Sequence, residues 1–399
     1  MGDFYESHPY PPPVDDLDAY RRAWDDPRRR ADSHCFWPAE LYREDRSILV
    51  AGCGTTQAAH YAVRWPRARV VGIDVSATSI AFTQELKRKH SLDNLEVREL
   101  AVEQARELDQ TFEYIVCTGV LHHLSDPDAG LRALREVLAP SGAIHVMVYA
   151  PYGRAGVYML QEYCRRLRIG WSDAEIRDLA ASLKALPPDH PIVPLLRSSP
   201  DFATTAGLAD ALLHPNDRAY SVPQLVEFLE RAGLRFERWM RQAPYLPGCG
   251  ALASFPHHAM LAALPRNEQY AAIELFRGTM VRHSLVADRS DAPTNGTIDF
   301  NAGDWPHYVP IRLPGTIAVR ERLPAGATAV LINRNHTYTD LYLPIDGGQE
   351  RLLTAIDGKR PIAEIAGAES DRARDFFEQL WRWDQVVFDT SRVGRASAS

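Results

Sequence analysis

The sequence predicts an α/β fold with an open parallel sheet, followed by a smaller α+β domain of winged-helix type. Between residues 47 and 150, apolar runs that follow turn signals alternate with helical periods, which is the βαβ pattern of a parallel sheet. Beyond residue 298 the pattern changes to short strand-like runs such as TAVLIN, followed by helical segments and the apolar QVVFD. The 399 residues allow about two to three domains.

The first apolar run, SILVA at residues 47–51, leads directly into Gly52, Cys53 and Gly54, and AAHYAVRW reads as a helix. A strand, a glycine turn and a helix start allow a ligand to contact bare backbone. Dinucleotides and S-adenosylmethionine are the two ligand classes that use such a turn. The dinucleotide fingerprint GxGxxG would place its third glycine at Gln57, so the match to that class is broken there.

The second apolar run ends in VVGIDVS, which places Asp74 twenty residues after Gly54. A carboxylate at the tip of a strand can accept hydrogen bonds from both hydroxyls of a ribose. Both ligand classes need such a group, so Asp74 alone does not choose between them.

The later elements continue the alternation and then interrupt it. AGLRALREVL has an apolar face, and Asp126 followed by Pro127 forms an N-cap. After AIHVMVYA the alternation stops, because residues 152–216 read as an insertion with helices near 157–167 and 173–186. The alternation resumes with the helix SVPQLVEFLERAG and the strand LRFERWMRQ. A helix near 267–283 and the linker DRSDAPTNGT follow.

Charge and cysteine content narrow the function classes. The net charge is −7 with both signs interspersed and no basic face, so we expect neither a nucleic-acid partner nor a membrane partner. No apolar run reaches about 18 residues, and the N-terminus lacks a signal-peptide pattern. Five cysteines without a CxxC pair indicate neither a disulfide framework nor a zinc knuckle. We therefore expect a cytoplasmic protein.

The motifs VAGCGTTQ, VVGIDVS, FEYIVCTGVLHHLSDP and LREVLAPSGAIHVMVYA together resemble the class I S-adenosylmethionine-dependent methyltransferases. The resemblance covers residues 47–150 and 220–242 and implies a Rossmann-like sheet, S-adenosylmethionine as cofactor and S-adenosylhomocysteine as product. The sequence departs from the family pattern in three places: Val50 replaces its usual acid, Thr56 replaces its third glycine, and VRELAVEQA has no obvious acid at the end of the third strand, where Glu103 is the candidate substitute. The cofactor-binding residues that the resemblance implies are Gly52, Cys53, Gly54, Gln57, Asp74, Val75, Glu103, Thr118, Gly119 and Val120.

The N-terminal stretch FYESHPYPPP carries a second, shorter resemblance. It is similar to the start of some bacterial methyltransferases, including protein-lysine methyltransferases that also carry a C-terminal winged-helix domain. The residues that fit are Tyr5, Glu6, Pro9, Tyr10 and Pro11. The resemblance implies an arm that folds over the cofactor mouth.

Candidate catalytic and substrate residues follow the fourth and fifth strands. His122 and His123 either include a general base or serve as a cap and a packing residue. The candidate substrate residues are Tyr149, Tyr152, Arg154 and Tyr158, which lie where open α/β sheets bind ligands. In the alternative, the tyrosines pack between the lid and the core and the arginine is a surface charge. Cys249 with His257 and His258 matches no standard zinc spacing, so we expect no metal.

The sequence thus predicts a methyltransferase that acts on an unidentified acceptor, with a small metabolite or natural product favoured. A protein or peptide acceptor held by the C-terminal domain, a non-catalytic cofactor-binding regulator and a nicotinamide dehydrogenase are the alternatives, and a homodimer is possible. The expected segments are an N-terminal arm (1–46), the methyltransferase domain (47–151 and 217–247), a helical lid (152–216), a helical segment with linker (248–297) and the winged-helix-like domain (298–399).

Overall fold

The computed structural model describes residues 2–368 and 370–393. Its backbone contacts divide the chain into two compact units, each built from three separate stretches of sequence. Unit 1 contains the residues up to Arg22, Glu44–Phe236 and Glu274–Asp291. Unit 2 contains Ala23–Arg43, Glu237–Ile273 and the residues from Ala292 onward. The finer division into arm, lid and linker stays a prediction.

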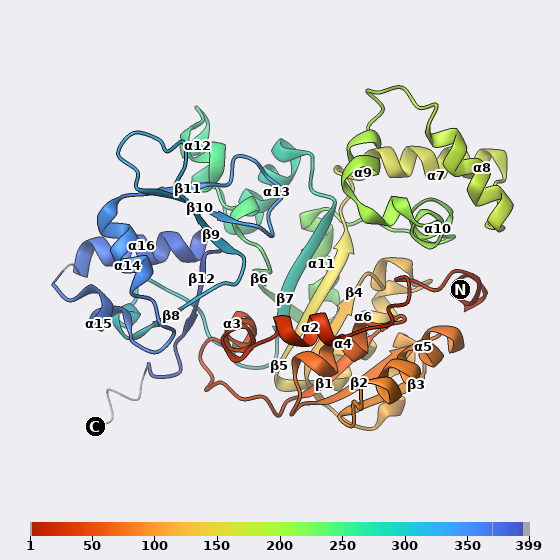
Figure 1. Ribbon diagram of the computed structural model, residues 1–399, viewed down its shortest axis with the longest axis horizontal. Coiled ribbons are helices and arrows are strands. Elements are labelled where there is room, and N and C mark those ends of the chain that lie inside the picture. Colours follow the sequence, from red (N-terminus) through yellow and green to blue (C-terminus); the bar gives the residue numbers. More distant parts are fainter. Residues whose placement is uncertain (1, 369, 394–399) are drawn as a thin grey trace. The chain divides into compact units, whose positions relative to one another are not determined.

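A seven-stranded sheet forms the centre of unit 1 and has the strand order β3–β2–β1–β4–β5–β7–β6 (Figure 1). Its strands are β1 (Ser47–Ala51), β2 (Arg69–Asp74), β3 (Leu95–Glu99), β4 (Phe112–Thr118), β5 (Leu138–Tyr149), β6 (Leu234–Trp239) and β7 (Arg282–Arg289). Strands β1 to β5 pair in parallel, and β7 runs antiparallel to β5. The predicted open α/β sheet is confirmed.

Strand β1 shows why the apolar run SILVA occupies the centre of the sheet. Leu49 lies opposite Val71 of β2 and Ile115 of β4, and all three side chains are fully buried. A central parallel strand is covered on both faces, so it is apolar nearly throughout rather than alternating. The glycine turn that follows β1 is therefore anchored on the most buried strand of the sheet.

The connecting helices are α4 (Gln57–Arg64), α5 (Ala77–Lys89), α6 (Pro127–Val137) and α11 (Val222–Arg231), with the short turns η1 (Val102–Leu108) and η2 (Leu121–His123). Three of the four connecting helices, α5, α6 and α11, begin at side-chain caps, and α4 does not. The predicted cap of α6 is confirmed, because the Ala129 N–H donates to Asp126 Oδ1 at 2.9 Å. Ser221 and Gln224 form a capping box at the start of α11.

Residues 152–216, here called the lid insert, hold more helix than the two predicted segments. The helices are α7 (Ala155–Leu167), α8 (Asp173–Leu183), α9 (Val193–Ser198) and α10 (Thr205–Leu213), with η3 (Pro200–Ala203) before α10. Helix α10 begins at Thr204, whose hydroxyl accepts from the Gly207 N–H at 3.1 Å. The lid insert has its own apolar core, and Phe4 of the N-terminal helix α1 (Gly2–Ser7) belongs to it.

The predicted helix near 267–283 was wrong at its C-terminal end. Helix α13 stops at Arg277, having begun at Arg266, and β7 starts at Arg282. Strand β7 is buried along most of its length between β5 and β6. Its first residues therefore pair with β5 instead of extending the helix, with Arg282 opposite Tyr149.

The C-terminal part of unit 2 has the small α+β structure expected beyond residue 298, and its winged-helix type stays a prediction. Strands β9 (Thr316–Val319), β10 (Ala329–Asn333) and β11 (Leu343–Ile345) form one antiparallel sheet, and β8 (Val309–Arg312) pairs with β12 (Val386–Asp389) in another. Its helices include α3 (Asp26–Phe36), α12 (His258–Ala262), α14 (Gly347–Thr354), α15 (Ile362–Ala366) and α16 (Ser370–Arg382). Helix α2 (Asp18–Ala23) begins in unit 1 and ends in unit 2, and α13 begins in unit 2 and ends in unit 1. The apolar face of α16, with Phe376, Phe377 and Leu380, is buried in the core.

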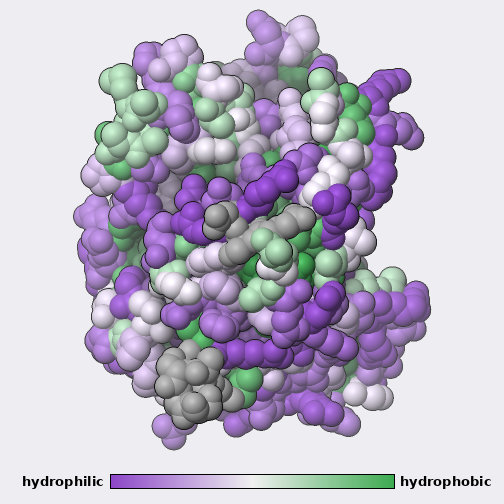
Figure 2. Space-filling view, turned by 90° about the vertical axis from the view of Figure 1, so that its left-hand side faces the viewer, coloured by the Kyte–Doolittle hydropathy of each residue, from purple (hydrophilic) through white to green (hydrophobic). Residues whose placement is uncertain are grey.

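The surface shows no sign of an extended apolar face on the side drawn in Figure 2, where hydrophilic residues dominate and hydrophobic ones form small groups. Within residues 2–368 and 370–393, none of the helices combines the length and the apolar character that crossing a bilayer requires.

Candidate active site

The glycine turn after β1 is shaped by backbone conformation and by close packing. Gly52 and Gly54 have φ angles of 67° and 52°, in the left-handed region that favours glycine. A Cβ on Gly52 would lie 2.3 Å from Val120 Cγ2. Glycine is therefore required here by the protein's own contacts as well as by any ligand.

Asp74 is held at the tip of β2 by two backbone donors. The Gly54 N–H donates to its Oδ2 at 2.8 Å and the Ser76 N–H to its Oδ1 at 3.0 Å. Burial raises the pKa of Asp74, and these backbone hydrogen bonds oppose the rise. Each carboxylate oxygen keeps a further lone pair, so the group can still accept from a ribose diol.

The other residues expected at the cofactor lie around the same strand ends. Gln57 Nε2 donates to Thr118 Oγ1 at 2.7 Å, and Gln57 Oε1 is buried without a protein partner. Cys53 is fully buried, and burial raises the pKa of its thiol well above its usual range. The remaining expected residues take these places: Gly119 with φ of 81°, Val120 half-buried, Glu103 half-buried in η1, and Val75 exposed at the rim.

The N-terminal arm lies directly over the glycine turn. A Cβ on Gly54 would come 2.6 Å from the Tyr10 carbonyl oxygen. Thr55 Oγ1 donates to the Pro11 carbonyl oxygen at 2.7 Å, and Glu6 accepts hydrogen bonds from Thr78 at the start of α5. The arm is thus attached both to the glycine turn and to the start of α5.

A second group of polar side chains meets beyond the ends of β4 and β5. We call it the acceptor cluster and define it as His122, His123, Tyr149, Arg154, Asp210, His214 and Asp217. The rings of His122 and Tyr149 are 4.1 Å apart, as are those of His123 and His214. Residues of η2, β5 and the lid insert therefore converge on one buried place.

The two histidines of η2 differ in their partners. His123 Nδ1 lies 2.8 Å from the Asn216 carbonyl oxygen, which can only accept, so this nitrogen carries the hydrogen. His122 is 1% exposed, and neither of its ring nitrogens has a hydrogen-bond partner in the described chain. Burial lowers the pKa of His123, and burial with the neighbouring cation of Arg154 and the other histidines lowers the pKa of His122 well below its usual range.

Arg154 and Asp217 form a buried pair. Their side chains are 8% and 2% exposed, and Arg154 Nη2 lies 3.5 Å from Asp217 Oδ2. Gln161 Nε2 also donates to this oxygen, at 2.8 Å, whereas Asp217 Oδ1 is buried without a partner among the described residues. The Arg154 guanidinium stacks 3.5 Å above the ring of Tyr149.

Two tyrosines connect the arm to carboxylates of the lid insert. Tyr5 donates to Asp210 Oδ1 at 3.1 Å, and Tyr10 donates to Asp201 at 2.9 Å. Burial raises the pKa of Asp210 to about 6, against the opposing effects of His214 and of the bond from Tyr5. Arm and lid insert thus close together over the acceptor cluster.

The structure brings most of the expected acceptor residues together, but it places Tyr152 42% exposed. The sequence reasoning did not identify Asp210, His214 or Asp217. Asp210 had a usable signal, since it is the single acid within the apolar run GLADALL of a short helix. His214 and Asp217 lie in an ordinary-looking polar loop, where nothing marked them.

Metal ligands are one further use for these groups. Among the described residues, His122, His123 and Asp217 bring one possible ligand atom each within 4.8 Å of one another, as do the exposed Asp16 and Asp18 with the half-buried His90. Arg154 already places a positive charge beside Asp217, which opposes a metal cation there. Cys249 and His258 instead lie near the backbone carbonyls of Arg382 and Leu252. The expected absence of a metal stays a prediction.

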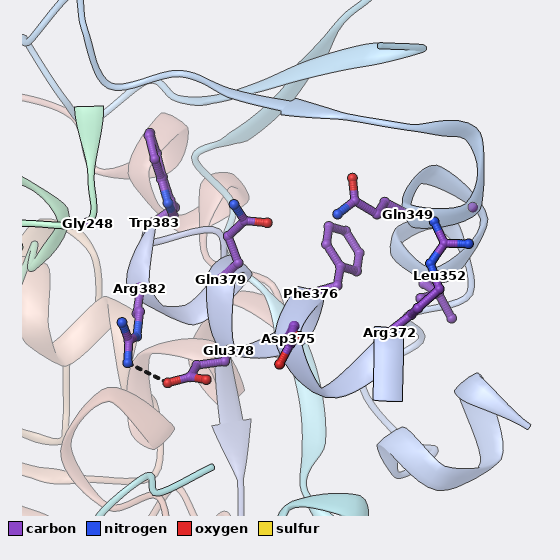
Figure 3. Close-up of a pocket in the computed structure, with 11 residues that line it drawn as sticks. Gly248, Gln349, Leu352, Arg372, Asp375, Phe376, Glu378, Gln379, Arg382 and Trp383 are labelled. Atoms are coloured by element: carbon purple, nitrogen blue, oxygen red, sulfur yellow. Dashed lines mark hydrogen bonds and ion pairs between the residues drawn. The ribbon is translucent and has the colours of Figure 1, made fainter. Parts of the chain in front are cut away.

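Unit 2 contains a separate open hollow of about 470 Å³, lined by α14, α16 and Gly248 (Figure 3). Arg372, Gln379 and Arg382 line it from one face of α16. Arg382 donates to Glu378 at 2.5 Å, so its charge is paired within the helix.

Comparisons with known proteins now decide the family. A profile described as a methyltransferase domain matches residues 49–144. An uncharacterized protein of Synechococcus sp. is 30% identical over 300 residues, which are 72% of this chain and 71% of that protein. The ubiquinone biosynthesis O-methyltransferase of Pseudomonas fluorescens is 30% identical over 100 residues, 25% of this chain and 42% of that protein. The chain belongs to the class I S-adenosylmethionine-dependent methyltransferases.

The fold of this methyltransferase is also found in a solved structure. PKMT2 from Rickettsia typhi superposes with a TM-score of 0.63 over 95% of this chain and 76% of that protein, at 17% identity, and a second structure of it holds AdoHcy. The cofactor of the methyltransferase is S-adenosylmethionine, and S-adenosylhomocysteine is the product. The unpartnered Gln57 Oε1 and the open lone pairs of Asp74 fit such a ligand. Membership of this family excludes the alternative of a nicotinamide dehydrogenase. Because the family is one of enzymes, it also argues against the alternative of a non-catalytic regulator.

Proposed function

We propose that the methyltransferase methylates a small molecule enclosed in the acceptor cluster, beneath α1 and the lid insert. One observation supports this proposal above the others. Seven polar side chains from η2, β5 and the lid insert meet there, and the arm is tied across them through the Tyr5–Asp210 bond. A buried group of polar side chains at the carboxyl ends of β4 and β5 suits an enclosed, polar acceptor.

The residues divide the work in this proposal. The bound cofactor supplies a methyl group already activated by its sulfonium. Asp74 holds the ribose of the cofactor. The backbone of the glycine turn, together with Thr118 and Gly119, lies along the cofactor, and the arm with the lid insert excludes water. His122 takes the proton of the acceptor, because the acceptor nitrogen of its ring has no partner among the described residues. His123, fixed by Asn216, positions that ring.

A labelling experiment tests the proposal. The enzyme is incubated with methyl-labelled S-adenosylmethionine and a cell extract from its source, beside an Asp74→Ala control, and the label is separated by size. We expect label in the small-molecule fraction with the intact enzyme only. Label confined to macromolecules would overturn the proposal.

A protein or peptide acceptor is the second candidate. It is favoured by the match of nearly the whole chain, unit 2 included, to the fold of PKMT2, and the hollow beside α16 offers a place for a peptide. Deleting the chain from residue 297 is a poor test, because α3 packs on β8 and β12 within unit 2. Gln379→Ala, with exposed Glu364→Ala as control, is sharper. Selective loss of macromolecular label in the first variant would favour this candidate.

Two expectations about the whole protein stay proposals. A cytoplasmic location is supported by the absence of a disulfide among its five cysteines, all of which the structure describes. A homodimer is the other, and sedimentation at several concentrations tests it.

A further inference from the structure

The acceptor cluster carries more buried negative charge than positive charge. The side chains of Asp210 and Asp217 are 5% and 2% exposed. The cation that faces them from the described chain is Arg154, 8% exposed, and it is engaged by Asp217 and by the ring of Tyr149. Buried carboxylates are expensive unless they are paired. Asp210, bonded only by the neutral hydroxyl of Tyr5 and 3.9 Å from His123, lacks a full countercharge.

The same place has unpaired hydrogen-bonding atoms, of which Asp217 Oδ1 and one nitrogen of the neutral His122 ring are acceptors. Asp217 Oδ1, both ring nitrogens of His122 and His214 Nε2 are buried without a partner among residues 2–368 and 370–393. Buried polar atoms are nearly always satisfied, so such a concentration of exceptions indicates that a ligand supplies the donors. His122 and Asp217 each bring an atom within 4.8 Å of the other, so one small group can reach both.

An ammonium group supplies what is lacking. It brings one positive charge and several N–H donors and has no acceptor of its own. A neutral hydroxyl brings one donor and no charge, and a carboxylate would add a third negative charge to the cluster. Both are poorer matches to the two buried carboxylates, Asp210 and Asp217.

We propose that the acceptor is a primary or secondary amine, bound as its ammonium ion by Asp217 and Asp210 beside His122, so that the methyl group goes to nitrogen. This inference rests on the proposed function and names the substrate class of the same site. Asp217 and Asp210 are the residues that determine the specificity.

The transfer balances without any further reactant. The ammonium gives one proton to a ring nitrogen of His122, which frees the nitrogen lone pair. A carbon–nitrogen bond then forms as the carbon–sulfur bond breaks, so the sulfonium becomes a neutral thioether and the product carries the positive charge as a methylated ammonium. His122 returns its proton to solvent when the arm and lid insert open.

Blocking the amines of the extract tests the substrate class. One half of the small-molecule extract is treated with an acetylating ester that caps primary and secondary amines, and the other half is mock-treated. We expect at least tenfold less label in the capped half. Equal labelling of both halves would overturn the amine proposal while the proposed function stands. Label in neither half would overturn the proposed function itself.

A binding experiment tests the residues without turnover. In the presence of S-adenosylhomocysteine, benzylamine and benzyl alcohol serve as matched charged and neutral probes, followed by calorimetry. We expect benzylamine to bind at least tenfold more tightly, and Asp217→Asn to lose about tenfold of that preference. The exposed Tyr163→Phe is the control, and unchanged affinity for S-adenosylhomocysteine shows that each variant is folded.

Two results would overturn the assignment of Asp217. One is an unchanged preference in Asp217→Asn together with Asp210→Asn. The other is a preference that disappears on adding EDTA and returns with zinc, since the cluster would then be a metal site.

Discussion

The cofactor end and the acceptor end of this site are built in opposite ways. At the cofactor end, Gly54 and Asp74 are twenty residues apart and meet through one backbone hydrogen bond within a β1–α4–β2 unit. At the acceptor end, Tyr5 and Asp210 are 205 residues apart and meet through side chains. The first arrangement follows from local chain geometry, whereas the second requires the arm and the lid insert to be in place. The cofactor end therefore depends on neighbouring segments of the chain, whereas the acceptor end depends on contacts between distant ones.

The two ends also differ in how completely their polar groups are satisfied. The oxygens of Asp74 both accept backbone hydrogen bonds, so this carboxylate is held in place before any ligand binds. The acceptor cluster instead leaves His122 and one oxygen of Asp217 buried and unpaired. Such atoms cost stability in the free protein unless a ligand or water pairs them.

The largest expected effect is a loss of turnover without a loss of stability when His122 is replaced. His122→Phe keeps an aromatic ring of similar size beside Tyr149 but removes the proton acceptor, so we expect turnover to fall by about 10²- to 10⁴-fold. The ring makes no hydrogen bond to the described chain, so the melting temperature should hold or rise. Rate measurements and calorimetry check both. His123→Phe is the contrast, because it loses the bond to Asn216 and about 1 kcal/mol of stability. A variant at His122 with normal turnover would remove its proposed role.

The next effect tests whether the cofactor end works alone. Asp74→Ala removes the carboxylate and leaves the Gly54 and Ser76 N–H groups without their acceptor. We expect affinity for S-adenosylmethionine to fall by roughly 100-fold, from about two charge-assisted hydrogen bonds. Calorimetric titration measures it, with exposed Asp93→Ala as control. Affinity within a factor of three of the unaltered protein would show that Asp74 does not hold the cofactor.

The same contrast explains which features could be predicted from the sequence. The sheet, the glycine turn and Asp74 follow from apolar runs and short spacings, which are properties of neighbouring residues. Strand β7 was missed because RHSLVADR follows a helix after a short loop and has charged residues at both ends. Helix α10 was missed because TAGLADALL is short and comes after a proline-rich stretch. Asp210 could not be assigned to the site without that helix, and Asp217 has no local mark at all.

A smaller effect concerns stability and pH at Asp210. Burial raises the pKa of this carboxyl from about 3.8 to about 6. The folded state therefore binds the proton more tightly than the unfolded state, so the contribution of Asp210 is fully present below about pH 4 and is lost as the pH rises through about 6. The groups that face Asp210 are Tyr5, His123, Arg154, His214 and Asp217.

Asp210→Asn removes this titration, and the new side chain can still accept from Tyr5. We expect the variant to be more stable than the unaltered protein at pH 8, by about 3 kcal/mol at most, and the difference to vanish near pH 4. Thermal unfolding across that range measures it, with exposed Asp178→Asn as control. A difference that does not change between pH 4 and pH 8 would contradict the raised pKa.

The smallest effect connects the two ends through the arm. Thr55 Oγ1 donates to the Pro11 carbonyl oxygen at 2.7 Å, directly beside the glycine turn, and Thr55→Val keeps the shape but removes the donor. Losing one neutral hydrogen bond costs about 1 kcal/mol, so S-adenosylhomocysteine should leave about fivefold faster in stopped-flow measurements, while exposed Thr279→Val should not change the rate. If release does not accelerate, the arm does not control cofactor exchange. The closing of the acceptor cluster must then depend on the lid insert alone, and the Tyr5–Asp210 bond would be a consequence of closure instead of its cause.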